Sequence, residues 1–153
     1  MFIIRHIMVA VSADSHSAYV TKCAISLAQM LNAKLTIIFV VNRYLIDELT
    51  KTGILASDEA KTFERDMEEE GKQFLARFKH IAENEKVSCE TILAHGVVHQ
   101  RIIEAIKKLM VDLLVIGDMR DLYSSRGVFY DEGERILREA ACPVLVIKLP
   151  AQT

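Results

Sequence analysis

Two apolar runs near the end of the chain constrain its fold more than any other feature. The runs 112–117 and 143–148 each have the length and β-branched content of a strand, and a polar loop and an amphipathic helix separate them. Continuous apolar runs are typical of parallel strands buried on both faces, and a crossover helix makes the two strands parallel. The first run ends in Gly117, where backbone amides can approach a phosphate. This stretch predicts half of a nucleotide-type α/β fold.

The same alternation of strand and helix extends over the rest of the chain. It predicts an open parallel sheet with helices on both faces. The remaining strands are expected over about residues 3–11, 35–41 and 87–94, and the remaining helices over about 15–31, 57–84 and 98–109. With the two terminal runs and the helix between them, five strands and four helices account for the chain. Residues 42–57 are predicted to be a flexible or partly helical crossover.

Apolar residues recur at intervals of three, four and seven along the longest predicted helix, which begins near Ser57 and ends near Asn84. This periodicity favours a surface helix packed on a sheet over a coiled coil or a partner groove. The acidic cluster on the opposite face is expected to be solvated. The stripe consists of Ala60, Phe63, Met67, Phe74, Phe78 and Ile81.

Length and charge limit the classes of function. A chain of 153 residues with 51% hydrophobic content fits a single α/β domain over residues 1–150. The formal net charge of −2 indicates no basic face for nucleic acid or an anionic membrane. No apolar run reaches the roughly 18 residues of a membrane helix, and the apolar start, interrupted by Arg5 and His6, is typical of a first strand. A cytoplasmic protein is therefore predicted.

The three cysteines, Cys23, Cys89 and Cys142, are far apart and lie among apolar neighbours. This pattern predicts buried, reduced thiols. A redox sensor that uses Cys142 is kept as an alternative, and it requires fast thiol modification in the native protein.

Four segments together resemble the universal stress protein family. Residues 9–17 resemble its first strand and turn, and residues 92–96 its third strand, which ends in glycine. Residues 111–117 resemble its fourth strand, and residues 134–147 its closing helix and strand. The resemblance covers essentially the whole chain. It implies an adenine nucleotide alpha hydrolase-like fold with sheet order 3-2-1-4-5, and a homodimer formed through the last strand, Val144 to Lys148.

The chain departs from the motif of the family members that bind ATP. Those members carry an aspartate after strand one, then Gly-x-x-Gly and, after a spacer, Gly-Ser or Gly-Thr. Gly117 matches the first glycine. The other positions differ: Ser12 replaces the aspartate, Arg120 the second glycine, Tyr130 the third, and Asp131 the serine or threonine. The bulky side chain of Tyr130 and the carboxylate of Asp131 oppose binding of a polyphosphate.

The loop after Gly117 still contains cations, hydroxyls and a flexible position, which can hold an anion in another arrangement. Adenine-nucleotide binding, with Mg and slow ATP hydrolysis, is therefore the alternative function. The predicted ligand residues are Ser12, Val41, Gly117, Arg120, Ser124, Ser125, Arg126 and Gly127, with Ser12 and Val41 near the base.

Other chemistry has weaker support. Ser12, Asp14 and His16 crowd one turn without a nucleophile elbow, and His95 and His99 straddle a strand end and a helix start. We assign no catalytic residue and no metal site. The sequence favours a stress-response or regulatory binding module, more consistent with a non-enzyme, that does not bind ATP and has no assigned cofactor.

Overall fold

The computed structural model describes residues 1–12, 15–118 and 128–150. Its centre is a five-stranded sheet in the order β3-β2-β1-β4-β5, and every pair of neighbouring strands is parallel. The strands are β1 (His6–Val11), β2 (Lys34–Asn42), β3 (Cys89–Gly96), β4 (Leu113–Gly117) and β5 (Val144–Ile147). The predicted fold class and strand order are confirmed.

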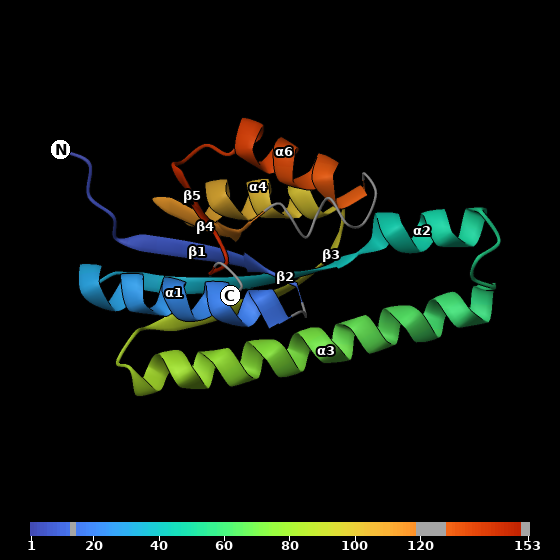
Figure 1. Ribbon diagram of the computed structural model, residues 1–153, viewed down its shortest axis with the longest axis horizontal. Helices are drawn as coiled ribbons and strands as arrows, with labels where there is room; N and C mark the ends of the chain where they lie inside the picture. The colour runs from blue at the N-terminus through green and yellow to red at the C-terminus, as the bar shows by residue number, and fades with distance from the viewer. Residues whose placement is uncertain (13–14, 119–127, 151–153) are drawn as a thin grey trace.

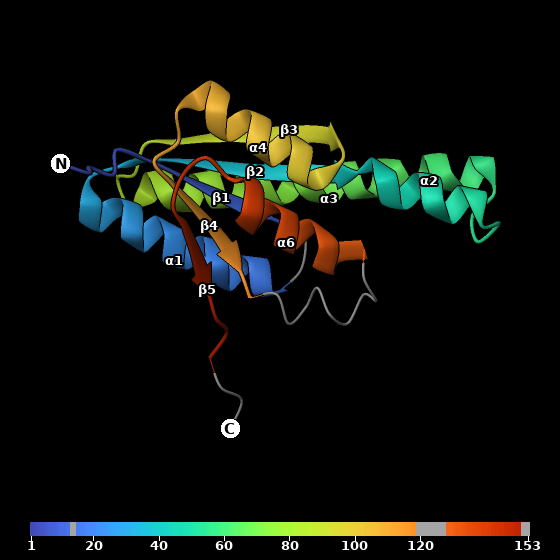
Figure 2. The same ribbon diagram turned by 90° about the horizontal axis from the view of Figure 1, so that it is seen from above.

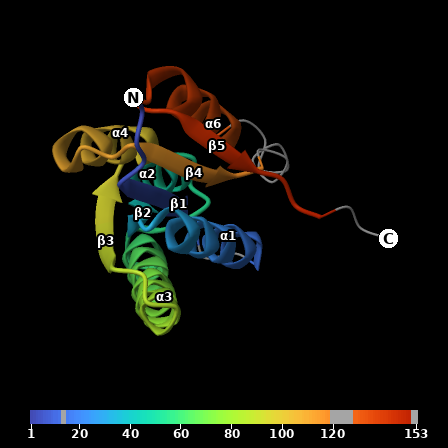
Figure 3. The same ribbon diagram turned by 90° about the vertical axis from the view of Figure 1, so that its left-hand side faces the viewer.

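Helices cover both faces of the sheet (Figures 1 and 3). α1 (Ser15–Leu31) and α3 (Ser57–Asn84) pack on one face, while α4 (Val98–Leu109) and α6 (Val128–Glu139) pack on the other. The core therefore has two layers, because alternate side chains of each strand point to opposite faces. In β2, Ile37 and Phe39 belong to the layer under α1 and α3, whereas Ile38 and Val40 belong to the layer under α4 and α6.

The longest helix begins and ends where the sequence predicts, at Ser57 and Asn84. Phe78 is fully buried, and the other members of its apolar stripe pack against the same core cluster, so the stripe contacts the sheet as predicted. Gly71 permits this close contact. A Cβ at that position would lie 2.6 Å from the Phe39 ring.

The crossover over residues 42–57, which was predicted to be flexible or partly helical, contains a helix. Residues Arg43–Lys51 form a helix, α2, whose first turn is capped by the Asn42 side chain, which accepts a hydrogen bond from the Leu45 amide at 3.0 Å. Ile46 is buried, and the Arg43 guanidinium pairs with Glu64 of α3 at 2.6 Å. α2 and the adjoining end of α3 extend beyond the strands (Figures 1 and 2).

The first strand begins at His6, later than the predicted start near residue 3, because its ladder with β2 begins with the pair His6 and Lys34. Asp112 holds this start in place. One of its carboxylate oxygens accepts hydrogen bonds from the amides of Arg5 and His6, each at 2.9 Å. The linkage joins the beginnings of two neighbouring strands, β1 and β4.

Candidate functional site

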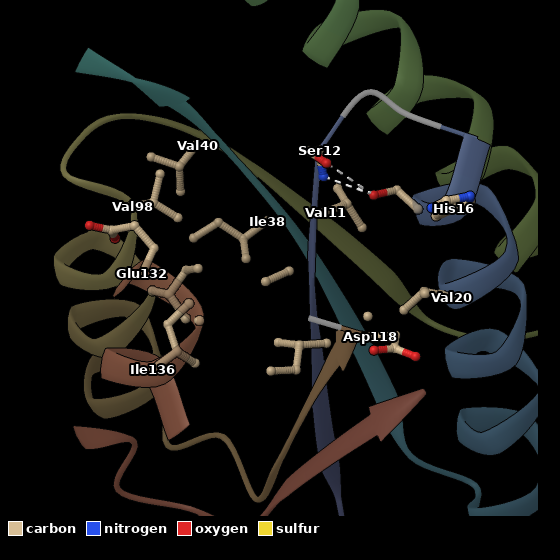
Figure 4. A pocket seen from close by; sticks show the side chains of 16 residues that line it. Val11, Ser12, His16, Val20, Ile38, Val40, Val98, Asp118, Glu132 and Ile136 are labelled. Atoms are coloured by element: carbon tan, nitrogen blue, oxygen red, sulfur yellow. Dashed lines mark hydrogen bonds between the residues drawn. The ribbon is translucent and has the colours of Figure 1, made fainter. Parts of the chain in front are cut away.

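A cavity of about 150 Å³ lies at the carboxyl ends of β1 and β4. This is the edge at which open parallel sheets bind ligands, because the connections after adjacent strands diverge there to opposite faces. Its walls come from both sides of the sheet: α1 contributes one, and α4 and α6 contribute another (Figure 4). The position agrees with the strand ends singled out in the sequence.

Aliphatic side chains form most of the cavity wall, which leaves few hydrogen-bonding groups to orient a ligand. The polar side chains that the structure places on the wall belong to Ser12, His16, Ser17, Asp118 and Glu132. The aliphatic ones belong to Ala10 and Val11 of β1, Val20 of α1, Ile38 and Val40 of β2, Val98 and Ile102 of α4, Ile116 of β4, and Ile136 of α6.

The turn after β1 brings Ser12 to the cavity. The Ser12 amide donates a hydrogen bond to Ser17 Oγ at 3.0 Å, and the two serine hydroxyls lie 3.4 Å apart (Figure 4). Ser17 is buried, so this contact anchors the end of β1 to the first turn of α1. Ser12 thus contributes a hydroxyl to the cavity wall.

The predicted ligand residues do not all come together. Ser12 and Gly117 line the cavity, and a Cβ on Gly117 would lie 3.2 Å from Val20. Val41 is fully buried in the layer under α1 and α3, whereas its neighbour Val40 lines the cavity. The remaining members lie outside the described residues: Arg120, Ser124, Ser125, Arg126 and Gly127. The side chains of Tyr130 and Asp131 also lie outside them.

A buried pair that the sequence did not predict connects α4 and α6 beside the cavity. Glu132 Oε2 accepts hydrogen bonds from the His99 amide at 2.5 Å and from His99 Nδ1 at 2.8 Å. The two side chains are only 8% and 13% exposed, so water competes little for these bonds. His99 and Glu132 are 33 positions apart, and only the packing of two helices brings them into contact.

The other histidine of the predicted pair faces elsewhere. His95 Nε2 lies 3.7 Å from a Glu68 carboxylate oxygen on α3, in a half-exposed position. His95 and His99 therefore have different partners. Among residues 1–12, 15–118 and 128–150, no group of three or more histidine, cysteine, aspartate or glutamate side chains is arranged to hold a metal ion.

The three cysteines form no disulfide: Cys89 is buried, and Cys23 and Cys142 are half-buried. Burial raises the pKa of Cys142, and it raises the pKa of Cys89 to about 11. A raised pKa keeps a thiol protonated at neutral pH and slows its reaction with oxidants. The environment of Cys142 is therefore that of a structural thiol more than that of a sensor. Across the described part of the chain, no helix is both long enough and apolar enough to span a bilayer.

The sheet order and the helices on both of its faces define an α/β protein with a nucleotide-binding-like fold. The chain belongs to the universal stress protein family, whose model matches residues 4–148. It is 29% identical to universal stress protein MJ0531 of Methanocaldococcus jannaschii over 95% of this chain and 83% of that protein.

Solved structures share the fold. UspA of Lactobacillus plantarum matches with a TM-score of 0.76 at 19% identity, over 95% of this chain and 98% of that one. A universal stress protein from Arabidopsis thaliana with AMP bound matches with a TM-score of 0.67 at 19% identity, over 96% of this chain and 93% of that one. At these identities the likeness extends to the fold alone.

Proposed function

We propose that this protein is a cytoplasmic stress-response or regulatory module that binds a small, largely apolar ligand in the strand-edge cavity and does not bind ATP. The size and lining of the cavity support the proposal. A volume of about 150 Å³ is well below the roughly 300–1,000 Å³ of most cofactor sites. An aliphatic wall with two carboxylates, on Asp118 and Glu132, matches a compact apolar molecule better than a polyphosphate.

The proposal has a direct binding test. Nucleotide-stripped protein is titrated calorimetrically with ATP and magnesium, while mass spectrometry identifies any small molecule that co-purifies. We expect no heat with ATP. Micromolar ATP binding would contradict the proposal and make the segment after Gly117 a noncanonical phosphate site.

A cavity-filling variant locates the binding site. Ala10→Leu enlarges a side chain of the wall, so it should abolish retention of a co-purifying molecule. Ala76→Leu makes the same change at an exposed position of α3 and is the matched control. Equal retention of ligand by both variants would place the site elsewhere.

Adenine-nucleotide binding is the second candidate, favoured by the Arabidopsis neighbour that holds AMP. If Tyr130 and Asp131 exclude phosphate, Tyr130→Gly combined with Asp131→Ser should create or strengthen ATP binding. Absence of a gain would undercut the idea that these substitutions disable an ATP site. The single changes, measured in parallel, separate the effect of bulk from that of charge.

We also propose a homodimer through β5. This strand is at the edge of the sheet, and an exposed apolar edge favours pairing with another chain. A groove of about 420 Å³ beside it is lined mostly by apolar side chains of α1, β4 and β5, together with Lys22 and Ser26 of α1, and Leu145 is 38% exposed. Leu145→Lys should yield monomers in analytical ultracentrifugation. Leu137→Lys, on α6 at the same 38% exposure, should leave the dimer intact.

A further inference from the structure

Two buried hydrogen-bond donors lack an acceptor where β2 and β3 end. They are Asn42 Nδ2 and Arg101 Nε, and within the part of the chain that the structure describes no other buried side-chain nitrogen or oxygen is left without a partner. An enclosed polar group without a partner has lost its hydrogen bond to water and gained none in return. Native proteins usually supply the missing partner, as a protein group, a water molecule or a bound ion.

The orientation of the Asn42 amide is fixed by the helix that it caps. Asn42 Oδ1 accepts a hydrogen bond from the Leu45 amide at 3.0 Å, and the residue is only 3% exposed. Turning the side-chain amide over would place its NH₂ group against the Leu45 N–H, so that two donors would face each other. The unpartnered atom is therefore the nitrogen, Nδ2.

Gly96 brings the two donors to the same place. Asn42 is paired with Gly96 in the ladder between β2 and β3, and strand alternation puts its side chain on the α4 side of the sheet, as it does for Val40. A Cβ on Gly96 would lie 3.0 Å from Arg101 Nε and 3.5 Å from Arg101 Cδ. The Arg101 side chain, which comes from α4, thus lies over Gly96, beside Asn42.

The missing partner is an acceptor, because both atoms can only donate. The amide NH₂ group and the guanidinium N–H groups carry hydrogens, and the guanidinium keeps its positive charge, so a metal ion does not fit here. Glu104 Oε2 lies 3.1 Å from Arg101 Nη1, which leaves Nε for a second acceptor. Carboxylates are well matched to guanidinium groups, since their oxygens accept strong, charge-assisted hydrogen bonds.

We propose that Asn42 and Arg101 form a binding site for a small carboxylate, which accepts hydrogen bonds from Nδ2 and Nε. Both donor atoms are enclosed, so the site takes a compact group. The Arg101 side chain is 38% exposed, so a ligand approaches from solvent past the guanidinium. Neither residue lines the strand-edge cavity, and the inference does not depend on the proposed function.

Sodium formate is the probe for this site. It is titrated into ¹⁵N-labelled protein while the Asn42 side-chain NH₂ signals and the Gly96 amide signal are followed by NMR. Sodium chloride at equal ionic strength is the control for a general salt effect. We expect a saturable response to formate alone. If the signals move no more with formate than with chloride, a buried water is the acceptor and the proposal is overturned.

Two variants test the donors separately. Asn42→Asp keeps an oxygen for the Leu45 amide, since aspartate also caps helices, but it replaces the donor by a negative charge. Arg101→Lys keeps the positive charge and removes Nε. Each should weaken formate binding at least about tenfold, the first because a buried charge repels a second anion. Arg135→Lys, at an exposed position of α6, is the matched control and should bind formate like the wild type. Unchanged binding in either site variant would overturn the proposal.

Thermal unfolding gives a second readout that does not need the titration. In Asn42→Asp the new carboxylate stands where the ligand would bind and offers Arg101 Nε an acceptor. This variant should therefore unfold at a higher temperature than the wild type in the absence of formate. Formate should raise the unfolding temperature of the wild type and leave that of Asn42→Asp unchanged. A less stable Asn42→Asp would contradict the placement of the two donors beside each other.

Discussion

The His6 ring is hydrogen-bonded to the Thr36 hydroxyl at 2.6 Å, inside the sheet at the start of two neighbouring strands. Its other nitrogen, Nδ1, lies 3.2 Å from the Leu109 carbonyl. A carbonyl only accepts, so Nδ1 donates; in the neutral ring Nε2 accepts from Thr36. The pair thus connects β1, β2 and the end of α4 in a buried place.

This arrangement predicts a pH-dependent stability. Burial lowers the pKa of His6 below its ordinary value of 6.5. The unfolded chain therefore binds the proton more readily, and the free energy of unfolding should fall as the pH drops below about 6.5. Urea unfolding of the wild type and His6→Gln, from about pH 8 to about pH 5, measures this effect. The variant should be less stable near neutrality and show a shallower decline; parallel curves would rule out His6 as the source.

Asp112 should stabilise the sheet where β1 and β4 begin. Asp112→Ala removes the acceptor for two backbone amides, and a loss of about 1–3 kcal/mol in the free energy of unfolding is expected. Asp112→Asn keeps one acceptor oxygen and should lose less. Asp47→Ala, which removes an exposed carboxylate 3.9 Å from Arg43, is the control for a weak surface contact. Equal effects at positions 112 and 47 would contradict the prediction.

Gly71 should be intolerant of a side chain despite its helical position. Alanine normally favours a helix by about 1 kcal/mol over glycine. In Gly71→Ala, however, the new methyl group meets the buried Phe39 ring at 2.6 Å and a Leu93 methyl group at 3.0 Å. Overpacking of this kind costs about 1–3 kcal/mol, so a net decrease in stability is expected in thermal unfolding. Gln73→Ala, an exposed position nearby, should be neutral or slightly stabilising.

The thiols should react slowly in the folded protein. Because burial raises the pKa of Cys89 to about 11 and also raises that of Cys142, little thiolate is present at neutral pH. Labelling with iodoacetamide, followed site by site by mass spectrometry, should be much slower in the native protein than in urea. Rapid native labelling of Cys142 would revive the redox-sensor alternative.

The regions predicted well are those in which local pattern and tertiary packing agree. The bounds Ser57 and Asn84 follow from a long apolar stripe and acidic residues at the helix start. The bounds of the helix Arg43–Lys51 were not predicted, although the segment was expected to be flexible or partly helical, because so short a helix is marginal by itself. Its stability depends on burial of Ile46 and the ion pair with Glu64. Asn42 was a sequence signal for the start of this helix, since asparagine is a favoured residue at helix amino-terminal caps.

The candidate site, too, was predicted from the sequence only in part. Ser12 and Gly117 were predicted because strand ends can be located from apolar runs, and parallel strands end at one edge of the sheet. Val41 was predicted to lie near a ligand. Successive side chains of a strand point to opposite faces of the sheet, however, so Val40 is on the cavity side and Val41 is in the opposite core layer. The sequence had singled out neither Glu132 nor Asp118.

By itself the sequence determined the alternation of strands and helices and the class of fold, because these depend on local periodicity and on the parallel arrangement it requires. The edge of the sheet at which a ligand would bind stays a prediction. Only the tertiary structure decided the size and charge of the cavity. The contact between His99 and Glu132 depends on how α4 and α6 pack, which no local pattern encodes. His99 and Glu132, which are 33 positions apart, form this hydrogen bond only because α4 and α6 pack on the same face of the sheet.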